Sequence, residues 1–214
     1  MTSAPDPLAV RSTYRHGDLR RVLLEAGMDL ARAGGPDAVV LREATRRAGV
    51  APNAAYRHFA SRDALLQAVR AAALSAVAGA MEAELATVST DLAPADFARA
   101  SVRAVGAGYL RFARAETGLF RTAFARSEVM IQATPEAPTA GASGLNPFEL
   151  LGAALDLLVS SGVMPTERRP GAEFLAWSAV HGLAMLVIDG PLAVIAPQME
   201  QVGQRLLDMV EKGL

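Results

Sequence analysis

The side chains that most often carry catalysis or bind metals are scarce and scattered in this chain of 214 residues. There is no cysteine, so a thiolate nucleophile and a thiolate metal site are excluded. The histidines, His16, His58 and His181, lie far apart, and no spacing of His, Asp or Glu resembles a metal site. Only Asp156 and Asp189 place carboxylates in apolar segments. We therefore expect neither an enzyme nor a bound metal or cofactor.

A different chemistry is offered by residues 52–58, PNAAYRH, where an amide, a phenol and an imidazole follow one another closely. An amide can pair with an adenine edge, and hydroxyl or basic groups bind phosphate. Residues 1–80 carry 11 arginines and 7 acidic residues, whereas residues 81–214 have a net charge of −5. This asymmetry favours a polyanion as the partner of the first third. Ordinary scatter of surface charge would also account for it.

The elements that position these side chains are predicted to be helices. Apolar residues recur at helical spacing, and alternating strand patterns are nearly absent. The expected helices cover about residues 17–33, 41–48, 52–59, 61–86, 95–115, 119–126, 148–160, 171–188 and 196–212. Residues 1–13 suggest a loose arm, and residues 132–147, rich in Pro, Gly and Ala, suggest a loop. We predict an all-α protein with about nine helices.

The segment LREATRRAGVAPNAAYRHF, residues 41–59, is typical of a helix-turn-helix. Gly49 would supply the tight backbone between the two helices, and Pro52 suits the first position of the second. Leu41 and Ala44 would face the core. The second helix would then present its first residues to base edges in the major groove.

At this point the sequence resembles a known family. Residues 17–66 resemble the DNA-binding domain of TetR-type transcriptional regulators, through LRRVLLEAGMDLARAGGPDAVVL, REATRRAGVAPNAAYRHF and SRDALL. More loosely, GLFRTAF and WSAVHGLAMLVIDG resemble a subgroup with a Trp-x3-His-Gly pattern in its C-terminal domain. The resemblance implies an arm and three-helix DNA-binding domain over residues 1–60. It implies a helical effector-binding and dimerisation domain over residues 61–214.

The resemblance also implies roles at the DNA. Asn53 would read a base directly, and a small residue beside it would contact a thymine methyl group. Arg62, which stands where the family usually has lysine, would clamp the DNA backbone. The implied contact residues are Arg46, Pro52, Asn53, Ala54, Ala55, Tyr56, His58 and Arg62. Two expected caps are missing, since Val40 and Ala51 precede the two helices without a side-chain acceptor, at a cost of about 0.5–2 kcal/mol each. We expect the helix-turn-helix to be loosely packed in the free protein and to become ordered when it binds DNA.

The family places a ligand cavity between its middle helices. Here the effector would be small and largely hydrophobic, with Tyr109 and His181 as polar anchors. The implied lining residues are Val105, Tyr109, Phe112, Phe124, Leu151, Leu155, Trp177 and His181. For His181, a hydrogen-bonded core histidine is an equally open interpretation, and plain core packing remains open for most of the aromatic residues.

The last two predicted helices carry apolar faces wider than one chain needs. The resemblance implies a homodimer formed through a four-helix bundle of these helices. The implied interface residues are Phe174, Ala184, Ile188, Val202, Leu206 and Met209. An internal packed pair within one chain is the alternative.

The sequence thus predicts a cytoplasmic, sequence-specific DNA-binding regulator, and the family favours a ligand-responsive repressor that binds a pseudo-palindromic operator as a dimer. No uncharged apolar run reaches the ~18–20 residues of a membrane helix, so no membrane partner is expected. Two alternatives stay open. One is an all-α enzyme or small-molecule-binding protein without DNA function. The other is a constitutive DNA-binding dimer whose cavity is filled by its own side chains.

Overall fold

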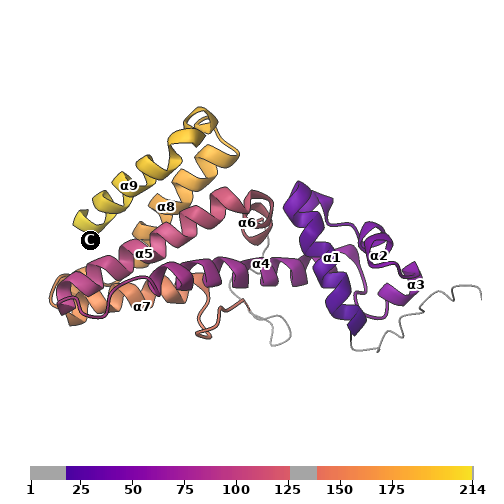
Figure 1. The fold of residues 1–214 in the computed structure, drawn as a ribbon, viewed down its shortest axis with the longest axis horizontal. Coiled ribbons are helices and arrows are strands. Elements are labelled where there is room, and N and C mark those ends of the chain that lie inside the picture. The colour runs from indigo at the N-terminus through magenta and orange to yellow at the C-terminus, as the bar shows by residue number, and fades with distance from the viewer. Residues whose placement is uncertain (1–17, 126–138, 214) are drawn as a thin grey trace, which may run out of the picture.

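The computed structural model of the protein describes residues 18–125 and 139–213. Over these ranges the chain forms nine α-helices, three short 3-10 helices and no strand, which confirms the predicted all-α class. Figure 1 shows an elongated molecule with a small group of helices at one end and a larger group at the other. We call the first group the head and the second the body.

The head contains α1 (Asp18–Gly34), α2 (Leu41–Ala48) and α3 (Pro52–Ala55), with the 3-10 helix η1 (Pro36–Ala38) between α1 and α2. These helices share one buried core, because each turns a face of small and aliphatic residues inward. The fully or nearly fully buried members are Leu23, Leu30, Ala31, Val39, Leu41, Ala44, Ala55 and Phe59. The head is therefore held by α1 against its shorter helices.

The long helix α4 (Arg62–Leu85) joins the head to the body (Figure 1). Its first turn is capped by Ser61, whose hydroxyl accepts the Ala64 N–H at 3.1 Å. It packs against α1 in the head and against the body helices α5, α6 and α7. By length and composition α4 could span a membrane, but half of its apolar stretch is buried inside the protein. That burial is what a core helix of a folded domain shows.

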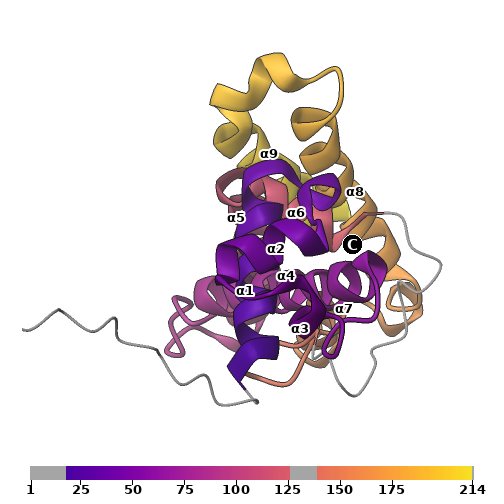
Figure 2. The same cartoon turned by 90° about the vertical axis from the view of Figure 1, so that its right-hand side faces the viewer.

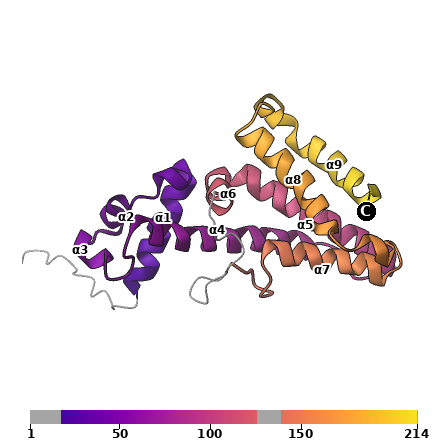
Figure 3. The ribbon, with the colours of Figure 1, turned by 180° about the vertical axis from the view of Figure 1, so that it is seen from behind.

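The body consists of α5 (Pro94–Ala115), α6 (Thr117–Ala123), α7 (Pro147–Ser160), α8 (Ala172–Ile188) and α9 (Met199–Gly213). Helix α5 runs back along α4, and α7 packs against both (Figures 1 and 3). Helices α8 and α9 lie side by side and stand off at an angle from the other body helices, as the end-on view in Figure 2 also shows. They are joined through the 3-10 helix η3 (Ala193–Gln198), and η2 (Thr166–Arg168) precedes α8.

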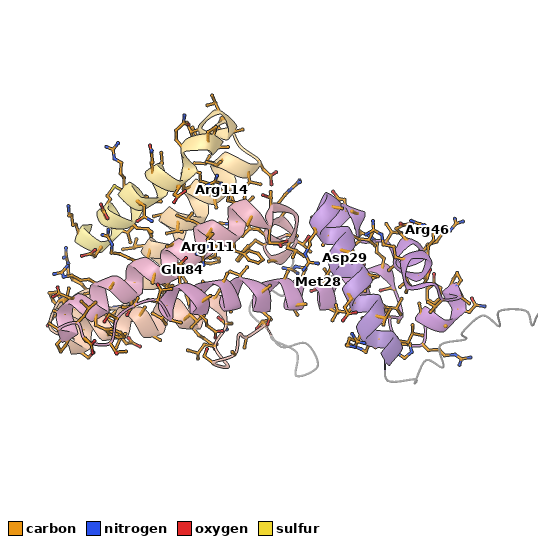
Figure 4. The ribbon with its side chains drawn as sticks, in the orientation of Figure 1. Met28, Asp29, Arg46, Glu84, Arg111 and Arg114 are labelled. Carbon is orange, nitrogen blue, oxygen red and sulfur yellow. The ribbon has the colours of Figure 1, made fainter. Side chains whose placement is uncertain are left out.

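The arginines of α5 connect the body helices to one another. Each pairs with an acidic side chain of α4 or α9, and Figure 4 labels Glu84, Arg111 and Arg114 among them. The pairs are Arg99 with Glu211, Arg103 with Asp208 and Glu211, Arg111 with Glu84, and Arg114 with Glu200. This side of α5 therefore clamps α9 onto the body.

The head meets the body where α1 contacts the junction of α5 and α6. Asp29, which Figure 4 shows on the side of α1 toward the body, pairs with Arg32 at 2.7 Å. Arg32 also donates to Glu116 at 3.2 Å. Gly118 lies so close to α1 that a Cβ there would be 2.2 Å from the Ala31 carbonyl oxygen. Only glycine fits at this position, so the head and body touch backbone to backbone.

The predicted helix boundaries hold to within one or two residues for most elements, with three corrections. Helix α9 begins at Met199, not near residue 196. Helix α3 ends at Ala55, not near Phe59, and the chain continues through turns. Phe59 is 2% exposed, and burying it turns the chain back toward the core. Helix α6 begins at Thr117, before Gly118, and not at Leu119. The loop predicted over residues 132–147 lies partly outside the described residues.

The described end of that loop is fastened to α4. The Glu82 carboxylate accepts hydrogen bonds from the backbone N–H groups of Ala142 and Ser143, both at 2.9 Å, and from the Ser143 hydroxyl. These bonds, the hydroxyl first, hold the pKa of Glu82 below its ordinary value. The Ser75 hydroxyl donates to the Ala140 carbonyl at 2.6 Å.

Candidate nucleic-acid interface and effector site

The turn between α2 and α3 has the backbone that the sequence predicts. Gly49 is left-handed, with φ 67° and ψ 29°, which is a conformation that glycine adopts without steric cost. The Val50 N–H donates to the Thr45 carbonyl at 3.1 Å and so closes the end of α2. Pro52 is at the start of α3. The two helices therefore form a helix-turn-helix.

Both helices of this unit begin without a side-chain cap, as predicted. The residues at the cap positions are Val40 and Ala51, and neither makes a cap hydrogen bond through its side chain. The first N–H groups of α2 therefore lack a side-chain acceptor. In α3, Pro52 has no N–H and the Ala54 N–H donates to the Ala51 carbonyl at 3.0 Å, which leaves the Asn53 N–H. A phosphate is one group that can accept such N–H groups.

The start of α3 presents an open surface. Pro52 and Asn53 are exposed, and Tyr56 is 57% exposed. Ala54 and His58 are half-buried. An amide and a phenol that face outward can donate to base edges and phosphates, so these positions suit the predicted contacts.

Ala55 needs correction. Its methyl group is fully buried in the head core, so it cannot contact a thymine methyl group. The fourth residue of α3 turns inward because the helix must anchor itself against α1 and α2. Ala54 remains the small residue that is available for such a contact.

Arg46 lies on the outer side of the head, remote from the body (Figure 4). Its guanidinium donates twice to Glu43, at 2.6 and 2.9 Å, and Arg47 lies 3.4 Å from the same carboxylate. The hydrogen bond from Arg46 lowers the pKa of the Glu43 carboxyl to about 2, so it stays ionised at neutral pH. A DNA phosphate would therefore compete with the Glu43 carboxylate for the Arg46 guanidinium. The three- and four-residue spacings could have revealed this cluster.

Arg62 has a structural role that the sequence did not reveal. Its Nε donates to the Val39 carbonyl at 2.9 Å, and its second terminal nitrogen donates to the Pro36 carbonyl at 3.0 Å. Arg62 thus clamps the connection between α1 and α2, where the Pro36 carbonyl also accepts the Val39 N–H at 3.3 Å. Its contact with the DNA backbone stays a prediction.

In the body, an aromatic cluster lies among α5, α6, α7 and α8. The Tyr109 oxygen is 2.7 Å from His181 Nδ1. The Trp177 indole N–H donates to the same Tyr109 oxygen at 3.2 Å. The Phe124 ring centroid lies 5.0 Å from that of His181. Four of the predicted lining residues are therefore brought together.

Sequence analysis missed two members of this cluster. Phe120 is fully buried with its ring centroid 5.2 Å from that of Tyr109, and Phe148 packs at 5.8 Å from Trp177. The three- to four-residue spacing of Phe120 and Phe124 on one short helix could have indicated the first. The other predicted lining residues belong to the same hydrophobic core: Val105, Phe112, Leu151 and Leu155.

Burial sets the protonation of the two polar anchors. It raises the pKa of Tyr109 above its ordinary value and lowers the pKa of His181 below 6.5. Both groups are thus neutral at pH 7. A neutral imidazole can accept the Tyr109 proton at Nδ1, which leaves the phenol oxygen to accept from Trp177.

Two hollows lie away from this cluster. One, of about 540 Å³, is lined by Arg205, Asp208, Met209, Lys212 and Gly213 at the end of α9. The other, of about 350 Å³, lies between α8 and α9 and is lined by Ser178, Ala179, Gly182, Leu183, Leu186, Val202 and Leu206. The second is an apolar groove, which we call the α8–α9 groove. It contains two of the predicted interface residues.

The outer face of α8 is apolar, whereas most of the exposed residues of α9 are polar or charged. Phe174 is 59% exposed and Met209 63%, so these two predicted interface residues are open to a partner, and Leu175 and Leu186 of α8 are exposed as well. Ile188 is half-buried. Ala184 is fully buried within its own chain, so its assignment to a dimer interface is wrong. Ala184 follows His181 by three residues and so shares the helix face on which His181 meets Tyr109 of α5.

The head geometry and the all-helical body together define a DNA-binding transcriptional regulator of the helix-turn-helix class. Comparison with known families agrees in both parts. Residues 23–69 match the model of bacterial regulatory proteins of the tetR family, and residues 102–210 match the tetracyclin repressor-like C-terminal domain. The chain therefore belongs to the TetR family of transcriptional regulators.

Solved structures of the same fold are similar along nearly the whole chain. A protein of unknown function from Rhodococcus sp. RHA1 is 26% identical, with a TM-score of 0.67, over 95% of this chain and 99% of that one. The TetR family transcriptional regulator PfmR from Thermus thermophilus is 21% identical, with a TM-score of 0.57, over 91% of this chain and 95% of that one. None of the curated proteins compared with the chain matches it.

Proposed function

We propose that the protein is a cytoplasmic, ligand-responsive repressor that binds a pseudo-palindromic operator as a homodimer and catalyses no reaction. The strongest support is the outward-facing start of α3, where Asn53 and Tyr56 are exposed on a helix-turn-helix. Repression, and not activation, follows from the family alone. In a dimer of this class, two recognition helices enter successive major grooves about 34–36 Å apart.

Support for the dimer comes from the α8–α9 groove. Its lining is almost wholly apolar and includes the exposed Leu186, and the exposed Leu175 lies on the same helix, α8. A contiguous apolar surface of this kind is unusual on a protein that stays monomeric. A second copy would bring the same groove, related by a two-fold axis.

Gly182 offers a direct test of that interface. A Cβ at this position meets nothing within 4 Å inside the chain, although the residue lines the groove. Gly182→Leu should therefore leave the fold of one chain unstrained and obstruct a partner. Sedimentation should show a dimer for the wild type and mostly monomer for the variant, and an undiminished dimer in the variant would exclude this face.

Support for the effector comes from the aromatic cluster and its link to the head. Helix α6 carries Phe120 into the cluster and is followed directly by Phe124, and its Gly118 touches α1 backbone to backbone. A small hydrophobic molecule that displaces the rings would push on α6 and so on the head. It can shift the DNA-binding equilibrium only by its differential affinity for the two states.

A second candidate, a constitutive dimeric DNA-binding protein, also has a specific observation in its favour. Trp177, Tyr109 and His181 already satisfy one another by hydrogen bonds, and Phe120 and Phe124 pack against them. The protein's own side chains thus occupy the place of a ligand. A thermal-shift screen of hydrophobic compounds separates the two candidates, because only the ligand-responsive protein would be stabilised.

Fluorescence anisotropy on DNA from upstream of the protein's own gene tests the main proposal. A scrambled duplex of equal length is the control, with salt varied over ~0.05–0.2 M. A preference of ~10³-fold or more for the upstream DNA is expected of a specific regulator. Absence of binding to both duplexes at low salt, together with catalytic turnover of any substrate, would instead favour an enzyme or carrier.

A further inference from the structure

Arg70 is an unusual residue for the interior of α4. It is 4% exposed, yet no acidic side chain of the described residues pairs with it. Its one hydrogen bond is donated to Gln67 on the same helix, at 3.2 Å, and its Nε has no partner. A buried charge without a counter-ion costs several kcal/mol, so such a residue calls for an explanation.

The position of Arg70 on α4 relates it to the effector site. It shares a helix face with Ala73, Val77 and Met81, since these residues follow at three, seven and eleven positions. That face meets α5, because a Cβ at Gly108 would lie 2.7 Å from Met81 Cα. Since α5 runs back along α4 (Figure 1), the first half of α4, to which Arg70 belongs in sequence, lies toward the end of α5 and toward α6.

The same elements carry the aromatic cluster. Tyr109 follows Gly108 on α5, and Phe120 on α6 packs against the Tyr109 ring. The face of α4 that carries the unpaired guanidinium is therefore turned toward the helices that hold the aromatic cluster. Desolvation lowers the pKa of Arg70, which is the expected response of a cation that lacks a counter-charge.

We propose that Arg70 is the counter-charge for the acidic group of the effector, and that the site takes an amphipathic carboxylic acid with an aliphatic or aryl body. This rests on the proposed function, since it takes the aromatic cluster as the effector site. A guanidinium binds a carboxylate through two parallel hydrogen bonds, and one Arg balances one carboxylate. A phosphate would leave excess negative charge in an apolar interior.

The test compares acids with alcohols of the same carbon skeleton. The probes are octanoate against octan-1-ol, and 4-phenylbutyrate against 4-phenylbutan-1-ol, at constant ionic strength. Calorimetry and thermal shift should show that wild-type protein binds each acid more tightly than its alcohol. In Arg70→Met the preference should fall by about 10- to 100-fold, because a charge-assisted pair is removed.

Two further variants control for general effects of charge and folding. Arg114→Met removes an exposed arginine of α5 that lies 3.5 Å from Glu200, and it should keep the preference for acids. Arg70→Met without ligand should melt no lower than the wild type, because an unpaired buried charge has been removed. Should Arg70→Met fail to fold, Arg70→Gln takes its place with the same expected loss. Equal binding of acids and alcohols by the wild type, or a preference that survives in Arg70→Met, would overturn the assignment.

The same probes added to the DNA complex separate this inference from the function it rests on. Acids that bind through Arg70 and release DNA support both. Acids that bind through Arg70 without changing DNA affinity support the acid site and contradict ligand-responsive repression. Release of DNA by alcohols as readily as by acids supports the repressor and overturns the role of Arg70.

Discussion

The helices of the head and of the body differ in length and in how their first turns are capped. In the head, α2 and α3 have eight and four residues and begin without side-chain caps. In the body, α7 begins with a capping box, in which Asn146 accepts the Phe148 and Glu149 N–H groups at 2.9 and 3.0 Å. Helix α5 lacks a cap as well but has 22 residues. Short uncapped helices depend on tertiary contacts, so we expect the head to be the less rigid of the two.

The largest expected effect on stability comes from Gly118→Ala, which would force the head and the body apart. In Gly118→Ala the new methyl group would meet the Ala31 and Arg32 carbonyls of α1, and backbone atoms cannot turn aside. We expect a loss of about 2–3 kcal/mol in the free energy of unfolding, measured in urea. The matched control is Gly79→Ala on α4, where a Cβ meets nothing within 4 Å. It should gain about 0.5–1 kcal/mol, and equal losses in both variants would contradict the close joint.

Asn53→Ala tests whether recognition of the DNA sequence depends on the head alone. The exposed amide should contribute ~1–3 kcal/mol of discrimination at one base pair. Anisotropy on a set of single-base operator variants should show relaxed preference at that position. The thermal stability of the body should not change. Unchanged base preference would remove Asn53 from the readout.

Glu43→Gln tests whether the acidic residue in the head opposes DNA. Without its charge, Arg46 and Arg47 are free to bind phosphate. DNA affinity should rise about two- to fivefold at low salt and less at high salt, because exposed ion pairs are weak and screened. Glu25→Gln on α1 is a control for the loss of one exposed carboxylate in the head. A larger gain in the control would show that net charge, and not this pair, matters.

The smallest expected effect concerns the body and its pH dependence. Burial holds the folded-state pKa of His181 below 6.5, so the unfolded chain binds the proton more readily. Stability is therefore full above pH 6.5 and falls as the pH drops below it. The melting temperature of the wild type should decrease between pH 7 and pH 5.5, more steeply than that of His181→Gln. Identical pH profiles would show that His181 is not buried as described.

The head was the region that the sequence predicted best. The bounds of α2, the tight turn at Gly49 and the start of α3 at Pro52 all follow from local chemistry, which acts between near neighbours. The errors arose where tertiary contacts decide. Ala55 and Ala184 are small residues whose inward direction depends on which helices pack beside them.

The candidate effector site was predicted only in part for the same reason. Tyr109, Phe124, Trp177 and His181 come from separate segments of the chain, and their gathering followed from family resemblance. The unpaired state of Arg70 depends on what surrounds α4, which periodicity does not give. The spacing of apolar residues thus identified the buried face of each helix, but the fold determines which of these faces pack together.

Hydrogen exchange of the free and DNA-bound protein tests the contrast between head and body most directly. In the free protein, amides of residues 40–58 should exchange much faster than those of α5 and α7, because the uncapped helices open locally. Binding to operator DNA should slow exchange in residues 40–58 and leave the centre of α5 unchanged. Exchange in residues 40–58 that is already as slow as in the body helices, or that DNA does not slow, would contradict the account.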